Sequence, residues 1–290
     1  MDNFFQHKAR KRFGQNFLVD ENIIERIVRA VAPKETDKLV EIGPGQGAIT
    51  QLLLQRCPSL TAVELDRDLI PLLQFKFRDY PEFSIIEKDA LKFDFGTLSE
   101  EAGGRPLRIV GNLPYNISTP LLFHLLSFRG KVQDMHFMLQ KEVVDRLSAT
   151  PGNKSYGRLS VMVQYHCRVQ GLFPVPPQSF RPAPKVESAI VRLIPHASPP
   201  HPAQDEALLE RIVNVAFQQR RKTLRNAIKP LYPDLDTDRL PVDAGRRPET
   251  FSVQEFVQLA NYCAELEKSN GKDSGLCFGH LRHRRYTGLF

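Results

Sequence analysis

The sequence predicts an α/β fold with a parallel, doubly wound sheet, followed by a small α-helical domain. Three observations lead to this prediction. Short apolar segments that resemble strands alternate with helical segments as far as Ala149, a glycine-rich turn follows the first of these strands, and the pattern beyond residue 205 is helical alone. Such alternation is typical of a parallel sheet with helices on both faces.

The first expected element is a helix over residues 20–32. Asp20 can cap its start, because its side-chain oxygen can accept from the free amides of the first turn. The apolar residues recur at the spacing of one helical face, and they are Ile23, Ile24, Ile27, Val28 and Val31.

The alternation then predicts six strands and four helices. We expect strands at 38–43, 60–66, 83–89, 107–112, 132–140 and, last, 190–194. We expect helices at 48–57, 67–77, 119–128 and 141–149. The segment 151–160 is polar and contains glycine, which predicts a loop.

The domain boundary is expected in the proline-rich segment 195–205, which has the composition of a linker. Helical periodicity returns in 206–228 and 252–267. We therefore expect a catalytic domain over 1–195, a helical domain over 205–267 and a basic tail of no assigned role over 268–290.

Composition narrows the class of protein. The formal net charge is +7, which is compatible with a polyanionic partner, although many basic proteins bind none. Four widely spaced cysteines without a C-x-x-C pair argue against a zinc site or a disulfide framework. No apolar run approaches the roughly 20 residues that span a bilayer, and no secretory signal follows the charged N-terminus. We expect a soluble, cytoplasmic monomer that binds neither metal nor membrane.

A nucleotide site is predicted at the glycine-rich turn in VEIGPGQGAIT (40–50). Gly43, Gly45 and Gly47 let the backbone turn tightly and approach a ligand closely. About twenty residues on, the second strand ends in Glu64, whose carboxylate can accept from both ribose hydroxyls. Asp89, after the third strand, can accept from an adenine amino group.

The glycine spacing favours S-adenosylmethionine over NAD. NAD sites use G-x-G-x-x-G to open a helix that binds pyrophosphate. Here the third glycine comes one residue early, and E-x-G-x-G-x-G is the pattern of S-adenosylmethionine sites, in which no phosphate is held. The alternatives are an NAD site and a structural glycine turn that binds nothing.

The chemistry is predicted at GNLPYNIS (111–118), directly after the fourth strand. These residues suit methyl transfer to the exocyclic N6 of adenine. This nitrogen is a poor nucleophile because its lone pair is delocalised into the ring. The Asn112 side-chain oxygen and a backbone carbonyl at Leu113 or Pro114 can accept from the amine and favour its pyramidal form. Tyr115 offers a flat face to the base. Because the amine becomes acidic only as it gains charge, no strong base, metal or nucleophilic side chain is needed.

Two further segments could bind the nucleic acid. Phe180, expected in a proline-stiffened loop just before the last strand pair, could stack on the other face of a flipped base. The segment from Val213 to Lys229 can be drawn as one helix. Its apolar stripe would lie beside an arc of cations that could contact phosphates, namely Arg221, Lys222, Arg225 and Lys229. The alternatives are that Phe180 only packs in the core and that the cations form a solvated helix face that binds nothing.

With these segments in view, the sequence resembles the KsgA (RsmA) family of small-subunit rRNA adenine N6,N6-dimethyltransferases over residues 8 to 267. It is similar, more distantly, to the erythromycin-resistance rRNA methyltransferases and the mitochondrial transcription factor B proteins. Eight matching segments occur in order: KRFGQNFL (11–18), VEIGPGQGAIT, VELD, EKDAL, GNLPYNIS, LQKEVVDRL (139–147), FRPAPKVES (180–188) and AFQQRRKTLRN (216–226).

The resemblance implies a Rossmann-like methyltransferase domain with a seven-stranded, mostly parallel sheet, and a small C-terminal helical domain. It implies S-adenosylmethionine-dependent dimethylation of two adjacent adenosines in a hairpin near the 3′ end of 16S rRNA, in the small (30S) ribosomal subunit or its precursor, and a role in subunit biogenesis.

The resemblance also assigns residues. Asn16 and Leu18 would line the cofactor site, Gly43 would pass close to the methionine part with Gly45 in the same turn, and Glu64 would hold the ribose. Asp89 would read the cofactor adenine, and Asn112 would touch both the cofactor and the target amine.

Three other functions are considered. A DNA adenine methyltransferase would share the Asn-Pro-Tyr chemistry, but the sequence shows no large target-recognition domain. A non-catalytic RNA-binding or transcription factor on the same fold is disfavoured by intact Glu64, Asp89, Asn112 and Tyr115. A large-subunit rRNA methyltransferase of the erythromycin-resistance type is the closest alternative, and AFQQRRKTLRN with its helical domain favours the small-subunit enzyme.

Overall fold

The computed structural model describes residues 16–219 and 221–273. The basic segment Lys8–Arg12 and the part of the expected tail from residue 274 onward lie outside these residues. Among the helices that are described, none has the length and apolar character needed to cross a bilayer.

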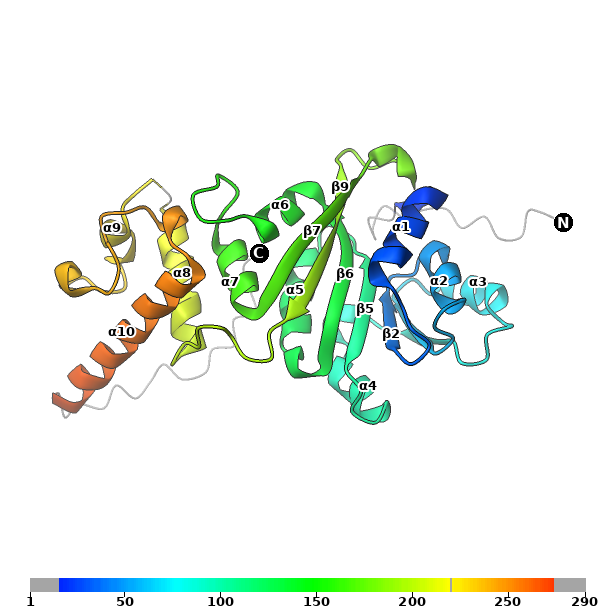
Figure 1. The fold of residues 1–290 in the computed structure, drawn as a ribbon, viewed down its shortest axis with the longest axis horizontal. Helices are drawn as coiled ribbons and strands as arrows, with labels where there is room; N and C mark the ends of the chain where they lie inside the picture. Colours follow the sequence, from blue (N-terminus) through cyan, green and yellow to red (C-terminus); the bar gives the residue numbers. More distant parts are fainter. Residues whose placement is uncertain (1–15, 220, 274–290) are drawn as a thin grey trace. The chain divides into compact units, whose positions relative to one another are not determined.

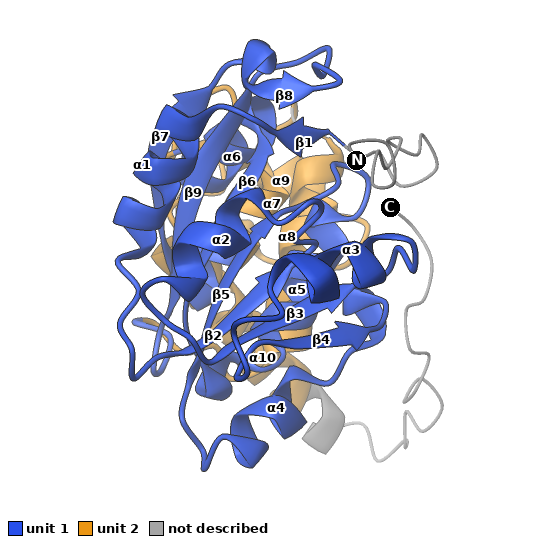
Figure 2. Cartoon of the chain, turned by 90° about the vertical axis from the view of Figure 1, so that its right-hand side faces the viewer, with its two compact units in different colours: residues 1–149, 163–200 blue, residues 150–162, 201–290 orange. Residues whose placement is uncertain are grey.

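The chain forms two compact units (Figure 2). The first contains residues 1–149 and 163–200, and the second contains residues 150–162 and 201–290. The segment 150–162, which the sequence analysis assigned to the first domain, therefore groups with the C-terminal helices.

A seven-stranded sheet forms the centre of the first unit (Figure 1). Its strands lie in the order β4 (Ser84–Glu87), β3 (Leu60–Glu64), β2 (Lys38–Ile42), β5 (Leu107–Asn112), β6 (Val132–Gln140), β9 (Ser188–Pro195) and β7 (Cys167–Val175). The first five strands are parallel, and β9 is antiparallel to both of its neighbours. The predicted fold class, a mostly parallel α/β sheet, is confirmed.

Helices cover both faces of this sheet (Figure 1). On one face lie α1 (Glu21–Val31), α2 (Ala48–Leu54) and α3 (Leu69–Lys76), and on the other lie α5 (Ser118–Leu126) and α6 (Lys141–Ser148). The remaining elements are α4 (Phe95–Glu101), α7 (Arg158–His166), a small sheet of β1 (Phe17–Leu18) and β8 (Phe180–Arg181), and the short 3-10 helices Ala90–Lys92, Arg129–Lys131 and Pro177–Ser179.

Helix α1 follows the predicted pattern. The Asp20 side chain accepts from the Ile23 amide at 3.2 Å and so caps the helix. The residues of the predicted apolar stripe are all buried, in one core with α2, α3 and the facing strand residues. The helix therefore buries the face that its sequence periodicity predicted.

The second unit contains α8 (Glu206–Gln218), α9 (Leu224–Ile228) and α10 (Val253–Asp273), with 3-10 helices at Thr237–Arg239 and Pro248–Thr250. Its core is aromatic: the ring of Phe217 lies 6.2 Å from that of Tyr156 and 5.7 Å from that of Phe256. Helix α10 continues beyond residue 267, so the first residues of the expected tail are helical.

Three sequence predictions of local structure were wrong. The expected loop at 151–160 ends where α7 begins, at Arg158. Strand β7 had no predicted counterpart, because it is an edge strand with many exposed side chains and a bulge at Leu172 that breaks the alternation. Phe180 consequently lies between the last two strands of the sheet rather than before them.

The single helix expected from Val213 to Lys229 is also wrong. Helix α8 ends at Gln218, and α9 begins only at Leu224. Between Phe217 and Leu224 the sequence has no apolar residue, so a helix there would have no face to bury. The loop around residue 245 instead provides hydrogen-bond acceptors for the first turn of α9. The Leu224 and Arg225 amides donate to backbone carbonyls of that loop at 2.8 and 3.0 Å.

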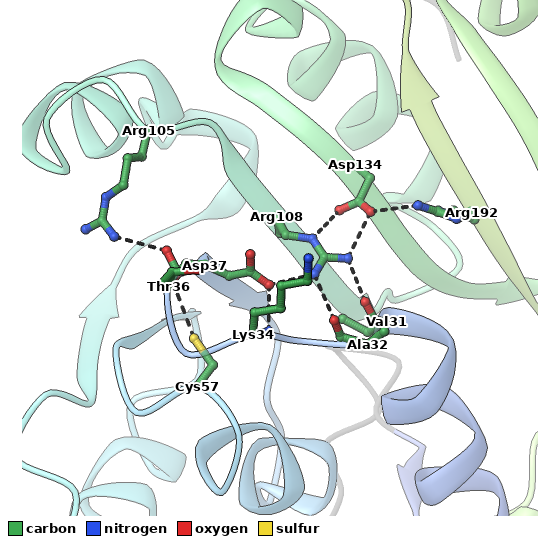
Figure 3. Close-up of polar contacts among 10 residues, drawn as sticks. All are labelled: Val31, Ala32, Lys34, Thr36, Asp37, Cys57, Arg105, Arg108, Asp134 and Arg192. Atoms are coloured by element: carbon green, nitrogen blue, oxygen red, sulfur yellow. Dashed lines mark hydrogen bonds and ion pairs between the residues drawn. The ribbon is translucent and has the colours of Figure 1, made fainter.

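A buried charge network joins α1 to three strands (Figure 3). The Arg108 guanidinium pairs with Asp134 at 2.9 Å and with Asp37 at 2.6 Å. It also donates to the Val31 and Ala32 carbonyls at 2.6 and 3.3 Å, and so caps the C-terminus of α1. Burial alone would lower the pKa of Arg108, but both carboxylates outweigh burial and raise it.

Removing the Arg108 guanidinium should destabilise the first unit strongly. Arg108→Met leaves the buried Asp134 with Arg192, at 3.3 Å, as its ion-pair partner among the described residues, and removes the side-chain donor to the last carbonyls of α1. We expect a loss of about 3–5 kcal/mol in the free energy of unfolding, measured by urea denaturation. As a control, Arg67→Met removes an exposed pair with Glu87 and should cost no more than about 1 kcal/mol. Equal losses in the two variants would contradict this account of the network.

Candidate active site

A cavity of about 350 Å³ opens at the carboxyl ends of β2, β3, β4 and β5. Ligands of parallel α/β sheets bind at this edge. The cavity is lined by Asn16, Phe17, Ile42, Gly43, Gly45, Val63, Glu64, Leu65, Leu69, Lys88, Asp89, Ala90, Asn112, Leu113, Pro114, Tyr115, Asn116, Ile117 and Phe180.

The glycine turn forms one wall of the cavity. Gly43, Gly45 and Gly47 all have positive φ, between 59° and 77°, which disfavours other residues. A Cβ on Gly47 would lie 2.6 Å from the Phe77 ring, so this glycine also allows α2 to pack on α3. The turn thus exposes backbone to the cavity, as its sequence predicted.

Glu64 ends β3 beside this turn. Its Oε1 accepts from the amides of Leu65 and Asp66, both at 2.8 Å, which fixes the carboxylate in one orientation. Burial raises its pKa, and these backbone hydrogen bonds oppose the rise. Across the cavity floor, Asp89 is half-buried and accepts from the Leu91 amide at 3.0 Å. Both predicted carboxylates therefore line the same cavity.

A second buried carboxyl, Glu41, is the first residue of the E-x-G-x-G-x-G pattern, and the sequence analysis gave its side chain no separate role. It accepts from the Thr50 hydroxyl at 2.6 Å and is 2% exposed. Burial raises its pKa to about 7, and the nearby Glu64 contributes to the rise, while Thr50 and Lys76 oppose it. Burial therefore favours the neutral form of both carboxyls, whereas a nearby positive charge favours the ionised form.

Asn112 ends β5 with its amide held in place. Its Nδ2 donates to the Asn16 carbonyl at 3.1 Å, which leaves its Oδ1 to accept from a ligand. In the turn that follows, the Leu113 amide donates to the Met138 carbonyl at 3.2 Å and the Ile117 amide to the Pro114 carbonyl at 3.1 Å. This turn is therefore held in place by backbone hydrogen bonds, and its residues Leu113 to Ile117 line the cavity.

Two aromatic side chains complete the cavity. Tyr115 is half-buried, and its hydroxyl lies 2.7 Å from the Ser188 hydroxyl. Phe180 is 1% exposed and packs in the core, yet it also lines the cavity. Core packing and a ligand contact are thus both available to Phe180.

The chain matches the Ribosomal RNA adenine dimethylase family over residues 6–265. It belongs to that family. It is 61% identical over 261 residues to the "Ribosomal RNA small subunit methyltransferase A" of Chromohalobacter salexigens, which covers 89% of this chain and 93% of the relative. It is 59% identical over 266 residues to the protein of that name from Pseudomonas aeruginosa, which covers 92% and 98%.

Two solved structures are also similar. A dimethyladenosine transferase from Plasmodium falciparum has a TM-score of 0.72 and 26% identity and covers 88% of this chain and 98% of its own. The 23S rRNA methyltransferase ErmE has a TM-score of 0.66 and 25% identity and covers 84% and 99%. The ribosomal RNA adenine dimethylases are methyltransferases, so this chain is an enzyme of that class.

Within this dimethylase, the cavity gathers every residue predicted for catalysis and most of those predicted for the cofactor. The exceptions are Leu18, which packs in the core beside α1, and Gly47, which lies against Phe77.

The polar and aromatic lining residues that the sequence analysis missed include Phe17, Lys88 and Asn116. Each directly adjoins a predicted residue, so adjacency was the available signal.

The four cations predicted to bind RNA lie in the second unit. Arg221, Lys222, Arg225 and Lys229 are all exposed, but they do not share one helix. Arg225 forms an ion pair with Asp238 at 3.1 Å. In the described parts of the chain, no group of His, Cys, Asp or Glu side chains could hold a metal ion.

Proposed function

We propose that the protein transfers methyl groups from S-adenosylmethionine to N6 of two adjacent adenosines in a hairpin near the 3′ end of 16S rRNA, in the small ribosomal subunit or its precursor. The observation that carries this proposal is one cavity that joins the glycine turn and Glu64 to the Asn112–Tyr115 turn. The names of the relatives at 57–61% identity support the small subunit as the substrate.

The cavity has the donors and acceptors that S-adenosylmethionine needs. Glu64 would accept from the ribose hydroxyls, Asp89 from the adenine amine, and Gly43 and Gly45 would let the methionine part lie against the backbone. The cofactor carries a sulfonium, whose positive charge would favour the ionised forms of Glu41 and Glu64 against the effect of burial. When bound, it supplies an electrophilic methyl group.

Asn112 would hold the target amine. Because Nδ2 is bound to Asn16, Oδ1 would accept one amine N–H. The Pro114 carbonyl already accepts from Ile117, which favours the Leu113 carbonyl as acceptor of the second N–H. Two acceptors around the amine favour its pyramidal, nucleophilic form, and its proton leaves after the methyl group has bound.

The target base would be held by aromatic rings. Tyr115 would stack on one face of the flipped adenine, and Phe180 would form the other wall of the cavity. The second unit would bind the RNA backbone through Arg221, Lys222, Arg225 and Lys229, which as phosphate contacts would position the hairpin without reading its sequence. A ribosomal substrate agrees with the expected cytoplasmic location, and action as a monomer stays a prediction.

The substrate can be tested directly with purified ribosomal particles. Immature small subunits should accept methyl groups and yield N6,N6-dimethyladenosine on nucleoside mass spectrometry, whereas large subunits should not. Methylation of large subunits alone would instead favour the activity of a 23S rRNA methyltransferase such as ErmE, to which the fold is also similar.

Glu64→Ala should lose much of the affinity for S-adenosylmethionine. The substitution removes two hydrogen bonds to a charged acceptor, each worth about 1.5–3 kcal/mol. Calorimetry should show the loss for S-adenosylhomocysteine as well. Glu87→Ala is a matched control, since Glu87 lies opposite Glu64 in the register of β3 and β4 but does not line the cavity. Unchanged affinity in Glu64→Ala would exclude this carboxylate as the ribose ligand.

Asn112→Ala should fold and bind small subunits but lose methyl transfer by about 10²–10³-fold, the usual cost of removing one preorganised hydrogen-bonding group. Rates would be measured with labelled cofactor on immature small subunits, and particle binding by filter retention. A variant that turns over at the wild-type rate would show that this amide does not orient the amine.

Replacing Arg221, Lys222 and Arg225 with Ala should weaken binding to small subunits. It should also flatten the salt dependence, by about one unit of log–log slope per lost phosphate contact. The expected loss is smallest for Arg225, because Asp238 already neutralises it. Affinity for the cofactor should not change.

The control for this variant removes the same charge from the first unit. Arg29, Lys34 and Arg105 are exposed cations away from the cavity, and their replacement with Ala should leave the salt slope unchanged. If both triple variants bind alike, the basic residues around α9 are not the RNA contact, and the segment Lys8–Arg12 becomes the next candidate.

A further inference from the structure

We propose that Ser188 is a positioning residue for methyl transfer, whose buried hydroxyl holds the tip of the Tyr115 side chain and so sets where its ring lies in the cavity. The two hydroxyl oxygens lie 2.7 Å apart, and Ser188 is fully buried while Tyr115 is half-buried. The proposal rests on the proposed function, because it assigns Tyr115 the stacking of the target base.

The Tyr115 backbone is held, but this alone does not fix its ring. The Ser118 hydroxyl donates to the Tyr115 carbonyl at 3.1 Å, and the turn that contains Tyr115 closes between Pro114 and Ile117 at 3.1 Å. The ring can still move about the first side-chain torsion, which has three staggered positions. A hydrogen bond at the phenolic end restricts where the tip of the side chain can lie.

Ser188 is a rigid partner for that bond. It lies in β9, opposite Gln140 of β6 on one side and Val175 of β7 on the other. The residue before it is also fixed, since the Glu187 carbonyl accepts from the Lys141 amide at 2.9 Å. Because neighbouring strands on both sides hold its backbone, Ser188 gives the Tyr115 hydroxyl a partner at a fixed position.

The geometry has a direct consequence for catalysis. A base stacked on Tyr115 follows the plane of the ring, and its amine must meet Asn112 at hydrogen-bonding distance. A misplacement of about 1 Å can cost about 10²-fold in rate. Ser188 would therefore affect turnover without touching the substrate.

The test is a double-mutant cycle on methylation of immature small subunits. Ser188→Ala and Tyr115→Phe remove the same hydrogen bond from opposite ends, and each should lower kcat by about tenfold to 10²-fold. Neither should change the KM for S-adenosylmethionine. The double variant should be no slower than the slower single variant. Tyr115→Phe keeps the test valid if Ser188→Ala folds poorly.

Ser99→Ala is the matched control. Ser99 is 2% exposed, donates to the Arg105 carbonyl at 2.9 Å and does not line the cavity. It should lose stability as Ser188→Ala does but keep kcat. Unchanged kcat in Ser188→Ala, or losses that multiply in the double variant, would overturn the proposal.

The same cycle measured by thermal unfolding separates this proposal from the proposed function. If the wild-type protein methylates no small subunits, the proposed function fails, but coupling between the two hydroxyls can still be measured in the unfolding free energies. Coupling in both stability and kcat supports a positioning role. Coupling in stability alone makes the bond structural and overturns it.

Discussion

The in-register pairing of β2 with both β3 and β5 is the constraint on which the site depends. In a parallel sheet the carboxyl ends of neighbouring strands meet at one edge. Ile42 pairs with Val63 and with Gly111, so the residues that follow, Gly43, Glu64 and Asn112, reach the same edge. Side chains far apart in the sequence thereby face one cavity, and neither the glycine turn nor the Asn-Leu-Pro-Tyr turn forms a site alone.

The reversed strand β9 completes the site for a related reason. Since β7 runs parallel to β6, it ends at the edge where β5 ends, and β9 starts there. The connection between β7 and β9 therefore carries Phe180 to the cavity, and the first residue of β9, Ser188, to the Tyr115 hydroxyl. A wholly parallel sheet would need a crossover here and would not deliver these two residues together.

Buried charge is treated differently at the two edges of the sheet. Near the amino ends, Arg108 meets two carboxylates and two carbonyls, and the network is satisfied within the protein. Near the carboxyl ends, Glu41 and Glu64 are buried close together and burial raises both pKa values. The first arrangement is paired within the protein, whereas the second holds two titratable groups away from their ordinary pKa values, as functional sites often do.

The sequence alone determined the α/β class, the α1 stripe and the two turns that carry the chemistry, because apolar periodicity and glycine or proline spacing are local properties. Only the tertiary structure decided the rest. The bulge in edge strand β7 breaks its apolar alternation after a few residues, and the break between α8 and α9 depends on which side chains can be buried in a core. The Tyr115–Ser188 contact joins residues 73 positions apart. Its existence depends on strand order and direction, which hydrophobic periodicity does not encode.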